Sequence, residues 1–225
     1  MSKVFIGVGH GGNDSGAVGK GGTLEKSLNL SIAKACGAAL ERNGVKVQLS
    51  RTKDEADTVE QEVAECNSFA PDLAVDIHNN AGGGDGAEAY HTKSGGTGKK
   101  LAENILAQLS ALGQKSRGAK TRLNSSGADY YAFIRQTKAP AVIVECAFID
   151  SDDIALIDTE VERIAVGEAI AKGILQTLGV KYTASSSTNS STLYRVQCGA
   201  YSKRENAEAQ AERLKKAGFN AIITK

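Results

Sequence analysis

Three short apolar runs, each leading to a residue that can bind a metal or carry a proton, are the most constraining feature of this sequence. The first run, Val4–Ile6, leads into the glycine-rich stretch GVGHGG around His10, the second ends at His78, and the third ends at Glu145. Short apolar runs bounded by glycines and polar residues are typical of buried strands. In an open α/β sheet, ligands and catalytic groups collect at the carboxyl ends of the strands. We therefore expect His10, His78 and Glu145 at one edge of a sheet.

The spacing of apolar residues alternates along the chain between that of strands and that of helices. Further strands are predicted at 45–49 and 87–91, and helices at about 24–43, 59–66, 99–112 and 161–178. The piece from 116 to 136 follows neither spacing. Alternating strands and helices predict the α/β class, with a mostly parallel, twisted sheet flanked by helices on both faces.

The composition changes abruptly near the end of the chain. Residues 183–192, TASSSTNSST, contain no core-forming residue and predict a Ser/Thr-rich linker after a first domain at 1–182. Residues 193–225 predict a small βαβ fragment, with strands at 193–198 and 219–224 around a helix that carries Ala207, Ala211 and Leu214. A fragment of about 33 residues buries too little apolar surface to hold a core alone.

The overall composition limits the partners of the chain. Its 225 residues carry a net charge of +1, which gives no electrostatic reason to expect nucleic acid or a membrane surface as a partner. We expect a monomer. The 4 cysteines show no CxxC spacing, so reduced thiols are expected rather than a disulfide framework. Cys146, which follows Glu145, is expected to be a packing residue rather than a nucleophile.

The N-terminus lacks the pattern of a secretory signal. Met1-Ser2-Lys3 leads directly into the first apolar run, without a long apolar segment and a small-residue cleavage site. No stretch of the sequence is long and apolar enough to span a bilayer. We therefore expect synthesis in the cytoplasm without a signal peptide, so that action outside the cell requires another exit.

Four residues could form a hydrolytic metal site. Two imidazoles and a carboxylate are the protein ligands of one common type of catalytic zinc, whose open fourth position holds a water, and a further carboxylate can serve as general base. His10, His78, Glu145 and Glu25, which begins the helix after the first strand, could fill these four roles. Histidine and glutamate at strand ends also occur as ordinary hydrogen-bonding groups, so the residue types alone leave both interpretations open.

Several separate motifs occur in the order known from one enzyme family. They are GHGGNDSGA at 9–17, Glu25 with Asn29, SRT at 50–52, AECN at 64–67, DIHNNA at 76–81, RGAK at 117–120 and VECAFI at 144–149. Over residues 3 to about 180 the chain thereby resembles the zinc-dependent N-acetylmuramoyl-L-alanine amidases, the type 3 amidase family of bacterial autolysins and phage endolysins.

The resemblance implies a reaction and a role for each of the four residues. His10, Glu25 and His78 match the positions of the family's zinc ligands, and Glu145 matches its catalytic carboxylate. The implied reaction is hydrolysis of the amide between the lactyl group of N-acetylmuramic acid and the L-alanine of the stem peptide, with Zn²⁺ as cofactor and peptidoglycan as partner. Two other functions stay open: a non-catalytic peptidoglycan-binding protein and a zinc peptidase that cuts within the stem peptide.

The sequence departs from the family pattern at two positions. Glu62 stands where the family usually has an arginine, and Asp76 stands where it often has a serine before Ile-His. Neither position is a metal ligand in the family, but Asp76 could alter the hydrogen bonding around His78.

Three further polar residues near the motifs are given no role by the resemblance. His91, the third histidine, is expected at the surface or at a strand end. Glu88 and Asp85 follow the DIHNNA motif and are expected to be solvated carboxylates rather than contacts of a substrate amine.

The tail resembles part of a second known family. YRVQCGAY at 194–201, with Ala207-Glu208 and AGF at 217–219, is similar to the first half of a SPOR domain, which binds glycan strands stripped of stem peptides. A complete SPOR domain has two such halves, so we expect a half repeat. Two settings fit the resemblances: an endolysin released through a membrane hole formed by a holin, and an autolysin freed when a sporulating mother cell lyses. The tail favours the second.

Overall fold

The computed structural model describes residues 1–184, 198–199 and 201–216 of the chain, which divides into two units, Met1–Ser185 and Ser186–Lys225. The first unit contains a sheet with the strand order β2-β1-β3-β6-β4-β5. Its strands are β1 (Lys3–Val8), β2 (Lys46–Leu49), β3 (Leu73–Asn80), β4 (Ala87–His91), β5 (Ser116–Lys120) and β6 (Ala141–Phe148).

Strand direction divides this sheet into two parts. Strands β2, β1, β3 and β6 are mutually parallel, whereas β4 runs antiparallel to β6 and β5 runs parallel to β4. The predicted α/β class with a mostly parallel sheet is thus confirmed. Because β4 and β5 run the other way, their first residues lie at the same edge as the last residues of β1, β3 and β6. Side chains at the start of β4 and β5 are therefore brought to the edge where His10, His78 and Glu145 were expected.

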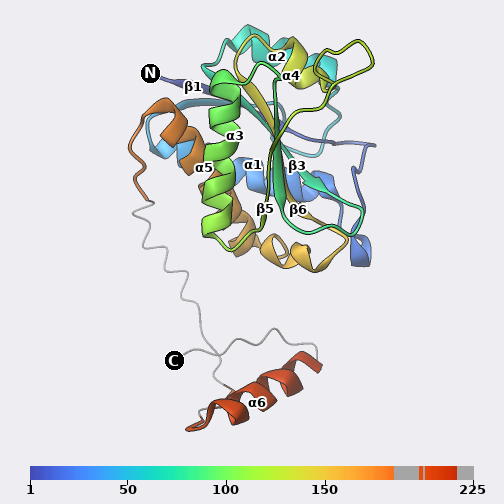
Figure 1. Cartoon of the computed structure of the whole chain (residues 1–225), viewed down its shortest axis with the longest axis vertical. Coiled ribbons are helices and arrows are strands. Elements are labelled where there is room, and N and C mark those ends of the chain that lie inside the picture. The colour runs from blue at the N-terminus through green and yellow to red at the C-terminus, as the bar shows by residue number, and fades with distance from the viewer. Residues whose placement is uncertain (185–197, 200, 217–225) are drawn as a thin grey trace. The chain divides into compact units, whose positions relative to one another are not determined.

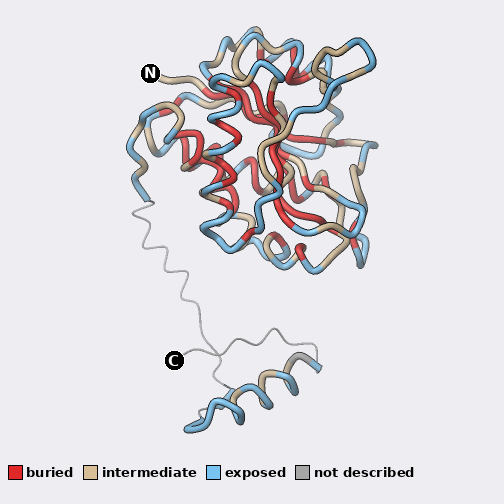
Figure 2. Tube along the Cα trace, viewed as in Figure 1, coloured by how far each residue is buried: buried red, intermediate tan, exposed pale blue. Residues whose placement is uncertain are grey.

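Helices cover both faces of the sheet, but unequally (Figure 1). The helices are α1 (Glu25–Arg42), α2 (Val59–Phe69), α3 (Gly96–Ala111), α4 (Ala132–Gln136) and α5 (Glu160–Leu178), with short 3-10 turns η1 (Lys20–Gly22) and η2 (Asp152–Leu156). The long helices α1, α3 and α5 enclose the larger core on one face, as the buried segments in Figure 2 show. Gly167 and Gly173 allow α5 to approach α1 and α3, because a Cβ at either glycine would collide with backbone atoms of those helices.

The second face of the sheet is covered by α2 and α4 near one edge only. Ala74 of β3 and Ile143 of β6 belong to the small core beneath these helices. Alternate residues of a strand share a face, so His78 and Glu145 lie on the same face, two to four residues nearer the opposite edge. Beyond the small core this face is therefore polar, and the polar half carries the predicted site.

The structure defines a helix in the segment 116–136, which the sequence left undefined, and in the predicted C-terminal fragment. Within 116–136 the structure contains β5 and α4. In the second unit, the helix predicted around Ala207 and Leu214 is present as α6 (Arg204–Lys216), with both of these side chains half-buried along it. The predicted strands at 193–198 and 219–224 lie outside the described residues, apart from Cys198.

The state of the cysteines and the hydropathy of the helices can be compared with the expectations from the sequence. Cys36, Cys66 and Cys146 are buried with free thiols, and Cys198 is free and exposed. Cys146 lies in the larger core, as expected of a packing residue. Among the described residues, no helix has the length and apolar character needed to cross a bilayer.

Candidate metal centre and its carboxylates

His10 follows the end of β1 in a backbone conformation that aims its ring at α1. Its φ of 63° lies in the left-handed region, which few residues other than glycine adopt. Gly11 and Asp14 exchange two backbone hydrogen bonds of 3.0 Å that close the turn. Asp14 Oδ2 lies 2.8 Å from His10 Nδ1, which leaves Nε2 on the other side of the ring. The turn therefore directs Nε2 of His10 toward Glu25.

Two buried side chains that received no role from the sequence hold this turn in place. The guanidinium of Arg51 donates to four backbone carbonyls, including those of Val8 (3.1 Å) and Gly9 (3.2 Å). Asn29 Nδ2 also donates to the Gly9 carbonyl, at 3.0 Å. Because Arg51 is only 2% exposed, these carbonyls are satisfied without water. The signal in the sequence was the SRT motif, whose arginine fixes the backbone directly before His10.

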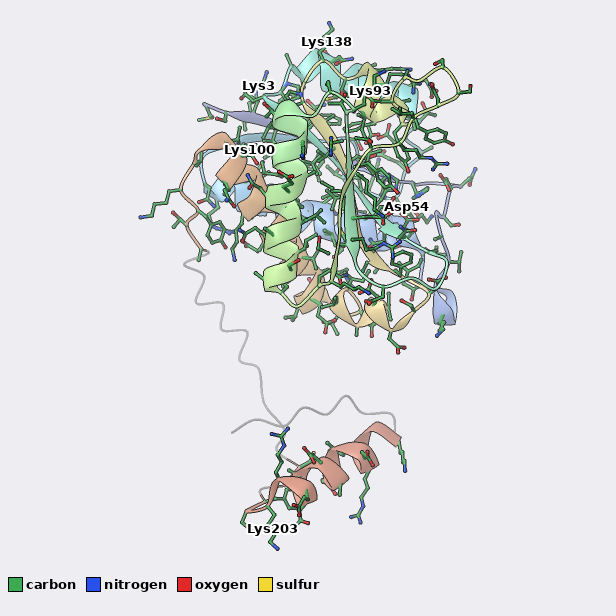
Figure 3. All side chains as sticks on the ribbon, viewed as in Figure 1. Lys3, Asp54, Lys93, Lys100, Lys138 and Lys203 are labelled. Carbon is green, nitrogen blue, oxygen red and sulfur yellow. The ribbon has the colours of Figure 1, made fainter. Side chains whose placement is uncertain are left out.

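The exposed carboxylate of Asp54 also stabilises the loop that follows His10. Its carboxylate accepts hydrogen bonds from Gly12 N (2.8 Å) and Lys26 Nζ (2.7 Å). Figure 3 shows Asp54 on the opposite side of the strands from Lys100 of α3. The loop that carries His10 thus lies over the sparsely covered face of the sheet.

His10, Glu25 and His78 converge on one point. Glu25, the first residue of α1, places Oε2 at 3.2 Å from His10 Nε2 and Oε1 at 3.2 Å from His78 Nδ1. One donor atom from each of the three residues lies within 4.8 Å of the others, and this is the only such group of His, Cys, Asp or Glu in the described part of the chain. The two rings stand edge to face with their centroids 5.0 Å apart. These three residues could hold a metal ion.

Hydrogen bonding holds the Glu25 carboxylate in its ionised form. Burial would raise its pKa, but hydrogen bonds with His10 and His78 outweigh burial and hold the pKa well below its ordinary value. The backbone N–H groups of Ala17 (2.9 Å) and Asn79 (3.0 Å) donate to the same carboxylate. Conversely, the hydrogen bond with Glu25 is the main cause of a raised pKa at His10. The hydrogen bonds of Glu25 with the two rings thus favour the ionised carboxylate, and the bond with Glu25 favours the protonated form of His10.

Glu145 stands beside His78 on the neighbouring strand. The two residues are direct cross-strand partners of β6 and β3. Glu145 Oε2 is buried and has no hydrogen-bond partner among the described residues. Burial, opposed by the nearby His78, raises the pKa of Glu145 to about 7. A carboxyl group with this pKa can exist in both protonation states near neutral pH, as an acid–base catalyst requires.

Glycines around the site make room for its own side chains. A Cβ at Gly9 would collide with the His78 ring, and a Cβ at Gly16 would collide with the His10 ring and with Glu25 Oε2. These two glycines of the GHGGNDSGA motif are therefore needed so that the site residues can approach one another.

The two departures from the family pattern lie next to each other. A Cβ at Gly7 would collide with both Glu62 Oε1 and Asp76 Oδ1, and neither of these buried oxygens has a hydrogen-bond partner. Burial and the neighbouring Asp76 carboxylate raise the pKa of Glu62 well above its ordinary value. The other oxygen of Asp76, Oδ2, lies 3.1 Å from His78 Nε2. Asp76 thus orients the His78 ring so that Nδ1 faces Glu25.

We expect Asp76→Ala to weaken metal binding without weakening the fold. Losing a carboxylate that orients a ligating histidine typically lowers metal affinity roughly 10- to 100-fold. The variant loses the contact of Oδ2 with His78, but it also removes the unpartnered Oδ1 and the repulsion between Asp76 and Glu62, so the free energy of unfolding of the metal-free protein should change little. Chelator competition measures the affinity and chemical denaturation measures the stability. Asp76→Asn, which keeps an acceptor oxygen for His78 Nε2, should lose less affinity, and equal affinity in all three proteins would contradict this role.

Glu88 is not the solvated carboxylate that the sequence suggested. It is 3% exposed and is the cross-strand partner of Glu145. Arg117 Nε (2.6 Å) and Lys120 Nζ (2.5 Å) donate to its Oε2, and the Tyr90 hydroxyl donates to its Oε1 at 2.9 Å. The prediction failed because reversal of β4 brings Glu88 to the site edge and turns it toward the cations of β5.

The remaining polar residues of this region agree with their predictions. Asp85 is exposed and pairs with Lys115 at 3.1 Å. His91 is the last residue of β4, where its Nδ1 lies 2.8 Å from the Thr92 carbonyl oxygen. It is buried rather than on the surface, and it lies at the edge opposite the site.

A family model described as N-acetylmuramoyl-L-alanine amidase matches residues 4–176, well over half of the chain. The chain belongs to the N-acetylmuramoyl-L-alanine amidase family. A second model, described as SPOR domain, matches residues 168–225 of this amidase. The first residues of that match lie in α5, which packs against α1 and α3 within the catalytic unit.

Two curated relatives of this amidase are a bacterial amidase and a phage endolysin. The sporulation-specific N-acetylmuramoyl-L-alanine amidase of Bacillus subtilis (strain 168) is 33% identical over 228 residues, which cover 99% of this chain and 84% of the relative. The endolysin of Bacillus phage SPP1 is 36% identical over 192 residues, which cover 80% of this chain and 68% of the endolysin.

A solved structure agrees with the fold of the first unit. The catalytic domain of CwlV, an N-acetylmuramoyl-L-alanine amidase from Bacillus (Paenibacillus) polymyxa var. colistinus, superposes with a TM-score of 0.72 at 30% identity. The superposition covers 80% of this chain and 100% of that domain. Together with the family match, this makes the chain a peptidoglycan amidase with a SPOR tail, as the motifs in the sequence implied.

Proposed function

We propose that this amidase cleaves the bond between the lactyl group of N-acetylmuramic acid and the L-alanine of the stem peptide, using Zn²⁺ held by His10, Glu25 and His78. The observation that carries the proposal is the convergence of these three donors within 4.8 Å, beside a buried carboxylate on the next strand. Two imidazoles and one carboxylate are a common donor set of catalytic zinc. The unpartnered Oε2 of Glu145 also fits a site whose water and substrate complete the polar contacts.

Each residue has a distinct part in the proposed reaction. When bound, zinc supplies a Lewis acid that polarises the scissile carbonyl and lowers the pKa of water. Glu145 takes one proton from the attacking water as its oxygen bonds to the carbonyl carbon, and delivers a proton to the amide nitrogen as the C–N bond breaks. The products are the lactyl carboxylate on the glycan and the free amine of L-alanine. Asp14 and Asp76 hold the rings of His10 and His78 in orientation.

Metal content and amine release, measured on the same preparation, test this proposal. We expect about one zinc per chain, release of L-alanine amines from purified sacculi, and loss of release on chelation that added zinc restores. Mapping the new termini separates the alternatives. New amines inside the stem peptide would indicate a peptidase, and binding to sacculi without any new amine would indicate a non-catalytic wall-binding protein.

The raised pKa of Glu145 predicts an acid limb in the pH profile. A general base must be ionised, so kcat/KM should fall about tenfold per pH unit below the pKa of Glu145. Burial raises that pKa to about 7, and a bound cation would lower it, so the midpoint of the limb should lie at or below pH 7. Zinc content must be measured in the same samples, because protonation of His10 or His78 would release the metal. A constant kcat/KM between pH 5 and 8 with zinc retained would contradict a raised pKa of Glu145 in the zinc-bound enzyme.

We propose that the enzyme acts on the cell wall after release by lysis or through a holin, following synthesis in the cytoplasm. The alignment with the sporulation-specific relative includes the tail, whereas the endolysin alignment covers 80% of the chain, which favours a sporulating mother cell as the setting. Glycan binding by the tail and a monomeric state belong to the same proposal. Fractionation of producing cells before and after lysis tests the route of release, since early appearance of the protein outside intact cells would oppose release by lysis.

A further inference from the structure

The row of charged groups that begins at the metal site continues across the sheet to a pair of cations. His78, Glu145 and Glu88 occupy neighbouring positions on β3, β6 and β4. On the next strand, β5, Arg117 and Lys120 both donate to Glu88 Oε2. The proposed acid–base catalyst Glu145 therefore lies two strands from the strand that carries these two cations, and their charged groups meet Glu88 on the strand between.

The Arg117 guanidinium is held in one orientation by contacts that leave its outer nitrogens free. Its Nε donates to Glu88 at 2.6 Å, and its Cζ lies 5.0 Å from the centre of the Phe148 ring. The terminal nitrogens Nη1 and Nη2 make no hydrogen bond with any described residue, and the side chain is 36% exposed. Lys120, with a side chain 34% exposed, also has ammonium protons available beyond its bond to Glu88. An oriented arginine with a free terminal face can bind a further group.

The charge of the cluster selects an anionic ligand. Glu88 carries one negative charge, since hydrogen bonds from Lys120 and Arg117 outweigh burial and hold its pKa below its ordinary value. Two cations around one buried carboxylate leave a net positive charge at the surface. A guanidinium presents its donors in a planar fork that matches the two oxygens of a carboxylate. The cluster is thus suited to a ligand carboxylate rather than to a neutral sugar.

We propose that Arg117, with Lys120 beside it, forms a subsite for a carboxylate of the stem peptide, on the side of the leaving amine. This inference rests on the proposed function. The lactyl carboxyl of the glycan is consumed in the scissile amide, so the free carboxylates of the substrate belong to the peptide. Neighbouring strands are about 4.8 Å apart, so β5 lies roughly 10 Å from Glu145 on β6. The charged groups of Arg117 and Lys120 reach Glu88 on β4, so they lie within this distance. At about 3.5 Å per extended residue, the span from Glu145 to the subsite is at most roughly three residues of the stem.

The subsite gives the substrate a direction on the enzyme. The peptide would run from the metal across β6 and β4 toward β5, and Arg117 would fix its position relative to Glu145. Glu88 acts here as a positioning residue, because its carboxylate is saturated by donors and cannot contact the substrate carboxylate favourably. The subsite should therefore affect substrate binding more than the chemical step.

A pair of soluble substrates tests the subsite. One is a muramoyl tripeptide with its peptide carboxylates free, and the other is the same compound with those carboxylates amidated. A charge-assisted hydrogen bond contributes enough to predict that the wild type prefers the acid roughly 10- to 100-fold in kcat/KM, mainly through KM. Arg117→Ala should lose most of this preference because its KM for the acid should rise, while its zinc content stays that of the wild type. Arg117→Lys should retain part of the preference.

Lys115 provides a matched control. It is a cation near the same end of β5, but its ammonium pairs with exposed Asp85 at 3.1 Å. Lys115→Ala should keep the preference of the wild type. Equal kcat/KM of the wild type for the acid and the amide would overturn the subsite even if Arg117→Ala does not fold, and so would an unchanged preference in a folded Arg117→Ala. Failure of the wild type to cleave either compound at the L-alanine amide would instead refute the proposed function.

Discussion

Glu145→Gln should keep its zinc and lose most of its turnover. The amide has the shape of the carboxylate but cannot accept the proton of the attacking water, and a positioned acid–base group typically contributes about 10²- to 10⁴-fold to the rate. Glu145 lies outside the group of donors formed by His10, Glu25 and His78, so zinc content should not change. Removing a carboxyl group whose pKa is raised by burial should not destabilise the fold. Amine release from peptidoglycan and metal analysis of the same sample measure the two effects.

An exposed glutamate supplies the control for this substitution. Glu103 of α3 has a side chain 56% exposed and only a 3.7 Å pairing with Lys99, so Glu103→Gln should match the wild type in rate and zinc content. A near-normal rate in Glu145→Gln would exclude Glu145 as the general base. Loss of zinc in Glu145→Gln, with zinc retained in Glu103→Gln, would instead indicate that Glu145 is a ligand.

The edge on which the site lies was predictable because it follows from local patterns. Each of the runs before His10, His78 and Glu145 is short, apolar and followed by polar or glycine residues, and parallel strands align their carboxyl ends. Glu25 was placed by the start of an amphipathic helix immediately after a glycine-rich loop. These signals are local in the sequence, so they can be recognised without knowledge of how the chain packs.

The surroundings of the site were not predictable because they depend on pairings between distant segments. Glu88 is buried only because β4 runs against β6 and beside β5, and nothing in the residues 87–91 specifies that direction. Arg51 stabilises the turn at His10 through carbonyls that lie more than 20 residues away in the chain. Glu62 and Asp76 looked like separate departures, yet α2 and β3 bring them together over Gly7.

The glycines show the same difference between local pattern and packing. A glycine-rich stretch such as the one around His10 is also typical of a flexible loop. In the structure, the space beside Gly9 is occupied by the His78 ring, and the space beside Gly16 is occupied by the His10 ring and the Glu25 carboxylate. A glycine needed for a close approach and a glycine needed for flexibility look alike in one sequence, and only the packed neighbours distinguish them.

The same group of donors leads to the second large effect, which concerns the metal itself. His10→Ala should purify with little zinc and have no measurable amidase activity. The variant removes the Nε2 donor, and the two remaining donors, Glu25 and His78, cannot complete the set of three protein ligands of a catalytic zinc. The affinity should therefore fall by more than the roughly 10- to 100-fold that follows from losing a residue that only orients a ligand. Metal analysis after gel filtration measures the content, and chelator competition measures the affinity.

The third histidine makes this test specific, because the chain has only 3 histidines and one of them lies at the far edge of the sheet. His91→Gln removes an imidazole from a buried strand end, so it should lower the free energy of unfolding while leaving zinc content and the rate per folded molecule unchanged. Unchanged zinc in His10→Ala would overturn the ligand assignment. His10 lies 3.2 Å from the Glu25 carboxylate, whereas His91 lies at the opposite edge of the sheet, so a defined site predicts zinc loss only in His10→Ala. Equal zinc loss in both variants would show that the metal is held by histidines generally.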